Sequence, residues 1–400
     1  MNRATLGALC VALISNGTFS AESDSITEAL SNGDGGLTFR YRFENVDQEG
    51  IDRDANASTL KTRLNYSSGS YKGLSAFFEV DDVTYLGGDH FNNTRNGHTG
   101  RPVVKDPDGT DVNQSYINYK SGDYNARLGR QRINLDNQRF VGGVGWRQNE
   151  QTYDGLLLSS DNENIDIHYA YVENISRIFG PEDGAPARSL DSDSHFLNFS
   201  MTDGIPGKLS AYAYLMDVKD AASASNKTIG VRYANTFEGR GLKFPMAVEI
   251  ATQDDHGDNP VNYSANYLLA EIGVQSGNST FGIGYEVLDG DKVAGKSFRT
   301  PLATLHKFQG WADKFLATPA TGIEDFYINL RHKSGAHSFA VTFHDFESEV
   351  GSSSLGSEWD LSWGYKINKT YSALLKTAVY EADNHATDTT KVWLMLTAAF

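Results

Sequence analysis

The sequence predicts an all-β fold, a transmembrane antiparallel up-and-down β-barrel of about 18 strands. Three observations predict it: apolar and polar residues alternate along most of the chain, the connecting segments alternate between short and long, and the last segment, KVWLMLTAAF, alternates up to Phe400. A period of two is typical of a strand with two different faces. A tilted strand of about 9–11 residues is long enough to cross a bilayer.

Composition agrees with this fold class and excludes one class of partner. The chain has 39 Gly, 20 Tyr and 21 Phe but only 9 Pro and 5 Met, which is typical of β proteins. Asp and Glu number 51 against 35 Lys and Arg, a net charge of −16. Because phosphate binding needs a basic surface, we expect no nucleic-acid partner.

The N-terminus resembles a secretory signal peptide. Arg3 precedes an apolar run over residues 6–14, and small side chains at Thr18 and Ser20 are suitable for cleavage. The only cysteine, Cys10, lies inside that run, so we expect a mature chain without disulfides. The predicted organisation is a signal peptide over 1–21, a short periplasmic segment over 22–36 and the transmembrane barrel over 37–400.

Each predicted strand separates apolar from polar residues. In the first, LTFRYRFENV, aromatic residues alternate with charged ones, and in the last strand Val392, Leu394, Leu396, Ala398 and Phe400 fall on alternate positions. We expect the apolar face of the last strand to meet lipid and its edge to pair with the first strand, which leaves no free edge. The terminal aromatic also resembles the signal by which outer-membrane proteins engage the barrel-assembly machinery, so Phe400 is the expected contact.

The connections predict which way the strands run. The short ones, of roughly two to seven residues, are rich in turn formers. The long ones fall near 47–57, 84–110, 133–151, 175–193, 218–225, 254–261, 289–322, 347–356 and 382–388. In an outer-membrane barrel, short turns face the periplasm and long loops face outside.

A soluble β-sandwich or β-solenoid is the alternative fold. Its second face would meet water, so charges would be common at any position. Charged residues here instead keep to one parity within their own strands, for example Arg40 and Arg42, Lys61 and Arg63, and Glu249. That restriction favours the barrel.

If apolar residues face outward, polar residues face an aqueous lumen. The first two strands place four cations together, and guanidinium groups bind carboxylates in a fixed fork, which favours an acidic solute. The alternative is that these cations pair with acids on the third strand and only stiffen the wall. The predicted pore-lining residues of the strands are Arg40, Arg42, Lys61, Arg63, Arg232, Lys243, Arg331, Glu79 and Asp81.

A second set of cations lies in LGRQRINLDNQRFVGGVGWRQNEQTYDG, a strand–loop–strand unit. Gly142, Gly143 and Gly145 permit a tight backbone there, so the unit could fold inward and set the constriction. Arg130 shares parity with Leu128, which indicates a bulge. The predicted pore-lining residues of this unit are Arg127, Arg130, Arg132, Arg139 and Arg147.

The segment RTPLATLHKFQGWADKFLATPATGIEDFYI predicts a short helix in the loop 289–322. Thr300 can cap it, Pro301 can open it and Gly310 can end it. Such a helix would lie across the mouth as a lid or bend into the lumen as a plug.

These two segments resemble the recurring segments of the alginate-export family of outer-membrane porins, and the size, strand count and terminal Phe agree across the mature chain. The resemblance implies an eighteen-stranded barrel whose arginine-lined lumen passes anionic polysaccharide or smaller anions.

Other motifs are weaker evidence of function. Asp106, Asp108 and Asp111 form a weak candidate Ca²⁺ site, without the spacing of a calcium loop, so we expect no metal and no cofactor. Three histidines, His332, His337 and His344, do not share a metal spacing and are interpreted as structural. No hydrolase or nucleotide-binding motif is present, so we expect a protein that is not an enzyme.

The sequence therefore predicts a channel in the bacterial outer membrane, surrounded by lipid and lipopolysaccharide, for passive diffusion of small hydrophilic, anionic or sugar-acid solutes. The first alternative is a dedicated exporter of an alginate-like anionic polysaccharide that works with periplasmic partners. The second is a surface-binding or enzymatic barrel with a closed lumen.

Overall fold

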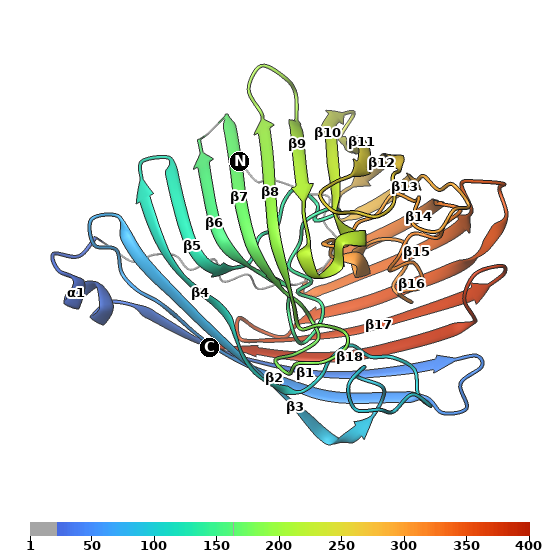
Figure 1. The fold of residues 1–400 in the computed structure, drawn as a ribbon, viewed down its shortest axis with the longest axis horizontal. Helices are drawn as coiled ribbons and strands as arrows, with labels where there is room; N and C mark the ends of the chain where they lie inside the picture. Colours follow the sequence, from blue (N-terminus) through green and yellow to red (C-terminus); the bar gives the residue numbers. More distant parts are fainter. Residues whose placement is uncertain (1–21, 163) are drawn as a thin grey trace.

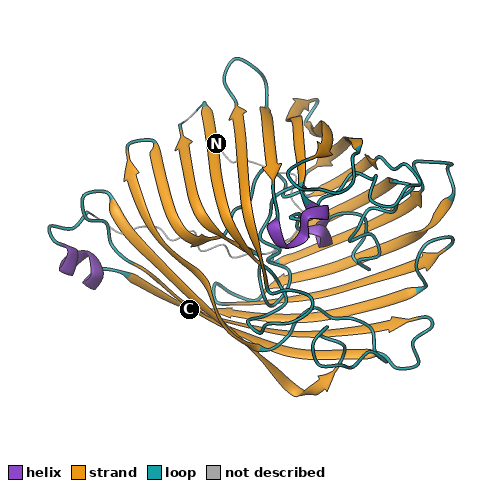
Figure 2. Ribbon diagram, viewed as in Figure 1, coloured by secondary structure: helices purple, strands orange, loops and turns teal. Residues whose placement is uncertain are grey.

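The chain forms a closed antiparallel barrel of 18 strands in this computed structural model, which describes residues 22–162 and 164–400 (Figures 1 and 2). The predicted fold class is therefore confirmed. The predicted signal peptide, with Cys10, lies outside the described residues. The strands are β1 (Asp34–Gln48), β2 (Ala55–Ser67), β3 (Leu74–His90), β4 (Gly109–Ser121), β5 (Tyr124–Gln131), β6 (Thr152–Asp161), β7 (Ile165–Ser176), β8 (Ser189–Met201), β9 (Lys208–Met216), β10 (Asn226–Gly239), β11 (Leu242–Asp255), β12 (Ser264–Ser276), β13 (Ser279–Leu288), β14 (Ile323–Ser334), β15 (His337–Glu347), β16 (Ser354–Lys366), β17 (Tyr371–Ala382) and β18 (Thr389–Ala399).

The barrel closes between its first and last strands. β1 pairs with both β2 and β18, with Thr38 in register with Ala399. Beyond β18, the Phe400 amide donates to the Leu37 carbonyl at 2.9 Å, and the Leu37 amide donates back at 3.2 Å. The final residue is thus held by hydrogen bonds to the first strand, as the alternation up to Phe400 predicts.

The two faces of the wall differ as a membrane barrel requires. Large apolar side chains on the outer face are exposed, including Leu64, Ile250 and Ile272 at about three-fifths of their surface. Their neighbours in sequence point inward and are polar or buried. An apolar outer band with a polar interior is what lipid outside and water inside select. Among the residues that the structure describes, no helix is long and apolar enough to cross a membrane.

The segment before the barrel contains a helix that the sequence analysis did not identify. α1 (Ile26–Ser31) is capped by Ser25, whose Oγ accepts from the Glu28 amide at 3.1 Å. β1 then begins at Asp34, three residues before the predicted barrel boundary. The helix lies beside the short turn between β2 and β3. The Gly69 amide of that turn donates to the Ala29 carbonyl of the helix at 2.8 Å.

Short turns and longer loops alternate over most of the barrel, although the first two connections, 49–54 and 68–73, are equal in length. Two long loops turn inward, loop 132–151 and loop 289–322, and Figure 1 shows them inside the ring of strands. They pair with each other, because Val141 and Leu302 form a parallel β-bridge and the Gly142 amide donates to the Leu302 carbonyl at 2.9 Å. The two loops therefore form one unit within the lumen.

The predicted helix in loop 289–322 is wrong. Only a 3₁₀ turn, η2 (Leu305–Lys307), forms there, and its N-cap, Thr304, makes no side-chain capping bond. Thr300 does not cap a helix; its Oγ1 accepts from Arg139 at 3.3 Å. Leu302 is committed to the bridge with loop 132–151, and this extended pairing outweighs the local helical signal. A second 3₁₀ segment, η1 (Lys219–Ala224), lies in the loop before β10.

Candidate functional site

Loop 132–151 crosses the lumen and reaches three parts of the wall. Asp136 accepts from Asn198 of β8 at 2.6 Å and from Ser210 of β9 at 2.9 Å. Farther along, the Arg139 Nε lies 2.7 Å from a carboxylate oxygen of Glu286 on β13. The loop then returns toward β1 and β2 before it enters β6. Its path therefore runs from β8 and β9, past β13, to β1.

Glycine makes this path possible at one close approach. A Cβ at Gly142 would lie 2.4 Å from Thr304 Oγ1 of the other loop. Thr304 Oγ1 itself bonds the Gln138 side chain at 2.8 Å and accepts from the Val144 amide at 3.2 Å. The glycine identified in the sequence is therefore required by contact between the two loops.

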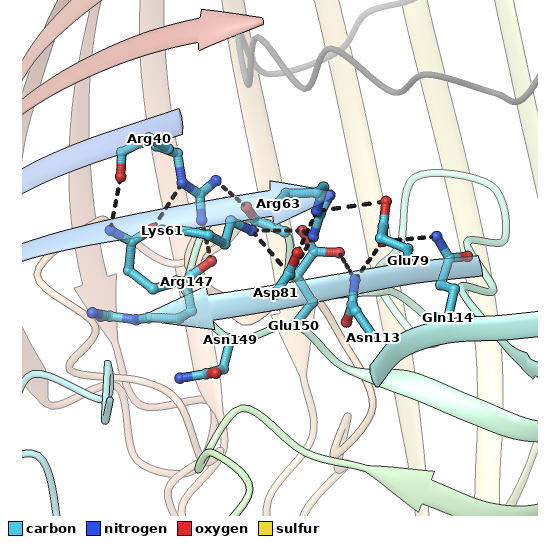
Figure 3. A network of polar contacts seen from close by, with 12 residues as sticks. Arg40, Lys61, Arg63, Glu79, Asp81, Asn113, Gln114, Arg147, Asn149 and Glu150 are labelled. Carbon is cyan, nitrogen blue, oxygen red and sulfur yellow. Dashed lines mark hydrogen bonds and ion pairs between the residues drawn. The ribbon is translucent and has the colours of Figure 1, made fainter. Parts of the chain in front are cut away.

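The cations of β2 form the centre of a buried polar cluster (Figure 3). Arg63 binds Asp81 of β3 with two parallel hydrogen bonds of 2.7 and 2.6 Å. Its Nη2 also donates to Glu150 at 2.7 Å. Lys61 lies 3.6 Å from Asp81 and donates to Glu150 at 3.1 Å. The strand cations are thus paired with acids from β3, as the alternative interpretation holds, and also with an acid of the loop.

Glu150 is the residue that sequence reasoning missed. Besides Lys61 and Arg63, Arg132 donates to it from Nε at 2.8 Å, and Asn113 contributes a longer contact of 3.4 Å. Burial opposes its ionisation, but Arg132, Arg63, Lys61 and Arg40 together hold the pKa of Glu150 well below its usual range. A carboxylate among five arginines was the available signal, in the stretch QNEQ just before β6.

Arg40 and Arg42 of β1 are held in different ways. The Arg40 guanidinium donates to the Gln148 side chain and the Gly145 carbonyl, both at 2.9 Å, and to the Arg147 carbonyl. Arg42 is only 1% exposed; it lies 4.0 Å above the Trp146 ring and 3.3 Å from Asp106. Arg42 is therefore enclosed, whereas Arg40 is partly exposed and bonds neutral groups of the loop.

Arg147 joins the two loops to the wall. It donates to Glu44 of β1 at 3.1 Å and to Asp313 of loop 289–322 at 3.0 Å. Asp313 also accepts from Lys391 of β18 at 3.0 Å and lies 2.7 Å from the His306 ring. Burial disfavours the charge on Asp313, yet Lys391, His306 and Arg147 hold its pKa well below its usual range.

Loop 289–322 is docked on the wall formed by β13 to β18. The Ala312 amide donates to Glu358 at 2.7 Å, and the Trp311 amide donates to Asp360 at 3.2 Å. Phe315 packs on Phe346 with ring centres 4.5 Å apart. These contacts place the loop inside the barrel and not over its mouth, which answers the lid-or-plug question in favour of an inward loop.

The remaining predicted cations on the strands lie apart from the cluster. Arg232 pairs with Glu249 at 2.8 Å on the wall opposite β2, and Lys243 pairs with Glu238 at 2.7 Å near the β10–β11 turn. Arg331 lies half-buried on the inner face of β14. The structure therefore spreads these three around the barrel.

Of the remaining cations in the unit, Arg127 lies 4.3 Å above the inward Tyr116 ring. Arg130 does not lie on the inner face where the prediction of a pore-lining residue placed it. It shares its face with the exposed Leu128 and binds Asp154 through Nε at 2.7 Å. No register shift occurs within β5, so the expected bulge does not bring Arg130 inward. It is an outer-face residue.

The acidic loop residues do not converge. Asp106 is fully buried and accepts from the Gln148 amide at 2.8 Å, whereas Asp108 is exposed and Asp111 lies 3.9 Å from Arg130. In the described part of the chain, no three His, Cys, Asp or Glu residues are grouped to hold a metal ion. His344 is paired with Asp325 at 2.9 Å, while His332 bonds Ser279 and His337 bonds Trp363.

Comparison with known proteins agrees with this architecture. Residues 33–173 match the family model described as alginate export, a range that contains the first of the two resembling segments and not the second. The chain shares its fold with Pseudomonas aeruginosa OpdK solved with vanillate (TM-score 0.71, 12% identity, covering 93% of this chain and 99% of that one). It also matches Acinetobacter baumannii OccAB4 (0.73, 13%, 92% and 98%) and P. aeruginosa OccK9 (0.72, 15%, 93% and 99%). No curated protein sequence matches it significantly.

Proposed function

We propose that this bacterial outer-membrane porin, which matches the alginate-export family over residues 33–173, passes small hydrophilic solutes by diffusion and favours those that carry a carboxylate, such as sugar acids. One observation carries the proposal. At the point where loop 132–151 meets β2, the side chains of Arg63 and Arg132 are mostly buried but keep about 15% of their surface exposed. A solute in the lumen can reach them.

Charge balance at this point supports the preference for anions. We call the seven groups Arg40, Lys61, Arg63, Arg132, Glu79, Asp81 and Glu150 the carboxylate cluster. It holds four cations and three carboxylates, so one positive charge is in excess. Guanidinium forks suit carboxylates in geometry as well as charge. Among proteins of this fold, OpdK was solved with vanillate, which is the anion of a small carboxylic acid.

Export of an anionic polysaccharide, with periplasmic partners, is the second candidate. The family match over residues 33–173 favours it. The two inward loops favour small solutes instead, because they tie opposite parts of the wall together through buried contacts such as Arg139 with Glu286. A ladder of oligouronates of rising length would separate the two functions, since an exporter passes long chains and a small-solute porin excludes them.

The test is conductance in planar lipid bilayers under a KCl gradient. We expect an open channel whose reversal potential indicates anion preference. Arg132→Gln should lower the chloride-to-potassium permeability ratio by about two- to fivefold, the effect of about 0.5–1 kcal/mol on one ion. Lys243→Gln, the same change of charge near the turn end of the barrel, is the matched control and should shift it less. Absence of any conductance would refute the proposal.

A further inference from the structure

We infer that Glu150 is a tethered counter-ion: its carboxylate occupies the site that a solute carboxylate uses, and the solute enters by displacing it. The inference rests on the proposed function and assigns the residue that sets its specificity. Figure 3 shows Glu150 reaching from loop 132–151 into the space between the β2 cations and β3. Its partners converge on it from β2, from β4 and from Arg132 at the opposite end of the same loop.

The donors around Glu150 form a complete carboxylate site. One oxygen accepts from Lys61 at 3.1 Å and Arg63 at 2.7 Å, and the other accepts from Arg132 at 2.8 Å. Asn113 approaches the second oxygen at 3.4 Å. Two oxygens with separate cationic donors are what a solute carboxylate would also require. The site therefore recognises a carboxylate group, whether it belongs to Glu150 or to a solute.

The backbone on the N-terminal side of Glu150 is fixed, so only its side chain is free to leave. The Gln148 amide donates to Asp106 at 2.8 Å, and the Asn149 side chain donates to the Pro107 carbonyl at 2.8 Å. Little of the Glu150 side chain is exposed, but Gly145 beside it is exposed, and a Cβ placed there would meet only Glu150 Oε1, at 4.0 Å. A solute can approach over Gly145 and along the exposed edges of Arg63 and Arg132.

Tethering explains how such a site can serve a channel. A covalently held carboxylate competes at an effective concentration in the millimolar range or above. Solute binding is then weak, which permits release, and conduction requires binding that is weak enough to leave. Without the Glu150 charge, four cations would face only Glu79 and Asp81, and a carboxylate would be held instead of passed.

The test compares Glu150→Gln with wild type in planar bilayers, with sodium D-glucuronate as the probe. Glucuronate should block the KCl current of the variant at a concentration lower by about tenfold or more, with longer blocked intervals, because its competitor has gone. Glu238→Gln removes the same charge near the β10–β11 turn, where Glu238 is two-thirds exposed, and should block as wild type does.

A second variant does not depend on removing a buried charge. Gly145→Val keeps every charge of the cluster and has an ordinary backbone conformation, but it narrows the approach. It should weaken the glucuronate block. If wild type conducts and responds to glucuronate while Glu150→Gln matches it, the tether is refuted and the porin proposal stands. If wild type shows no response to glucuronate, the proposed carboxylate preference itself fails.

Discussion

Two sides of the lumen carry opposite charge and are neutralised differently. On β1 and β2, which we call the basic wall, Arg42, Lys61 and Arg63 meet carboxylates. On β13 to β16, the acidic wall, Glu358 and Asp360 accept hydrogen bonds from backbone amides of loop 289–322. The basic wall is balanced by charge, whereas much of the acidic wall is balanced by dipoles.

Loop 132–151 serves both walls, with an acid for one and a base for the other. Glu150 lies among the cations of the basic wall, and Arg139 lies against Glu286 of the acidic wall. The difference between the two contacts is exposure. Arg139 is fully buried, while two partners of Glu150, Arg63 and Arg132, keep about 15% of their side-chain surface exposed. Under the proposed function, the acidic-wall contact is structural and the basic-wall contact exchanges with solute.

The largest effect is expected from Arg139→Ala. Glu286 would be left buried without its cation, with Tyr267 and Gln309 as its remaining donors among the described residues. Breaking a buried pair in this way costs about 3–5 kcal/mol. The free energy of unfolding in urea, measured in detergent micelles or vesicles, should fall by that amount.

Two further variants serve as controls for Arg139→Ala and compare the acidic wall with the basic wall. Arg139→Ala combined with Glu286→Gln should regain much of the loss, because no buried charge remains unpaired. Glu150→Gln should cost less than Arg139→Ala, since water reaches the edge of its site. Equal losses for the two single variants would show that both walls are equally structural.

A smaller, pH-dependent effect is expected where the loops meet. His306 is stacked on Trp146 with ring centres 4.6 Å apart, between Asp313 on Nδ1 and Lys376 on Nε2. A neutral ring satisfies both, donating to the carboxylate and accepting from the ammonium. Burial, and then Lys376, holds the pKa of His306 well below its usual range of about 6.5.

The direction of the pH effect follows from this lowered pKa. Below about pH 6.5 the undocked loop would bind a proton that the docked loop excludes, so docking weakens as pH falls and is fully present above that pH. The loss is about 1.4 kcal/mol at pH 5.5. Proteolysis within loop 289–322 should accelerate between pH 7.5 and 5.5, and His306→Gln should remove most of that dependence. Asp313 does not contribute there, because its pKa is lowered from an already acidic value.

The barrel could be predicted from the sequence because its signals are local. Alternation in each strand, and the alternation of short and long connections, follow from a wall with lipid on one side and water on the other. The closing of the barrel by the first and last strands also follows, because a last strand must cover its edge, although its register, with Thr38 beside Ala399, comes from the structure. The type and approximate bounds of most strands could therefore be predicted.

The site was predictable only in part, because its partners are distant in sequence. The cations of β2 were evident, but Glu150 lies 87 residues from Arg63 along the chain. The helix predicted after Thr300 failed for the same reason: Leu302 pairs with Val141 of another loop. Local propensity does not report which loops meet inside a lumen.

The smallest effect is expected from Arg130→Ala, and it sharpens the distinction between lumen and outer face. Arg130 shares its face with Leu128 and is paired with Asp154, with about 30% of each side chain exposed. Losing a partly exposed ion pair of this kind costs less than about 1 kcal/mol. The reversal potential under a KCl gradient should stay at its wild-type value, whereas Arg132→Gln, two residues away, shifts it. An equal shift for both variants would mean that proximity in sequence, and not the face of the strand, decides which arginines a solute encounters.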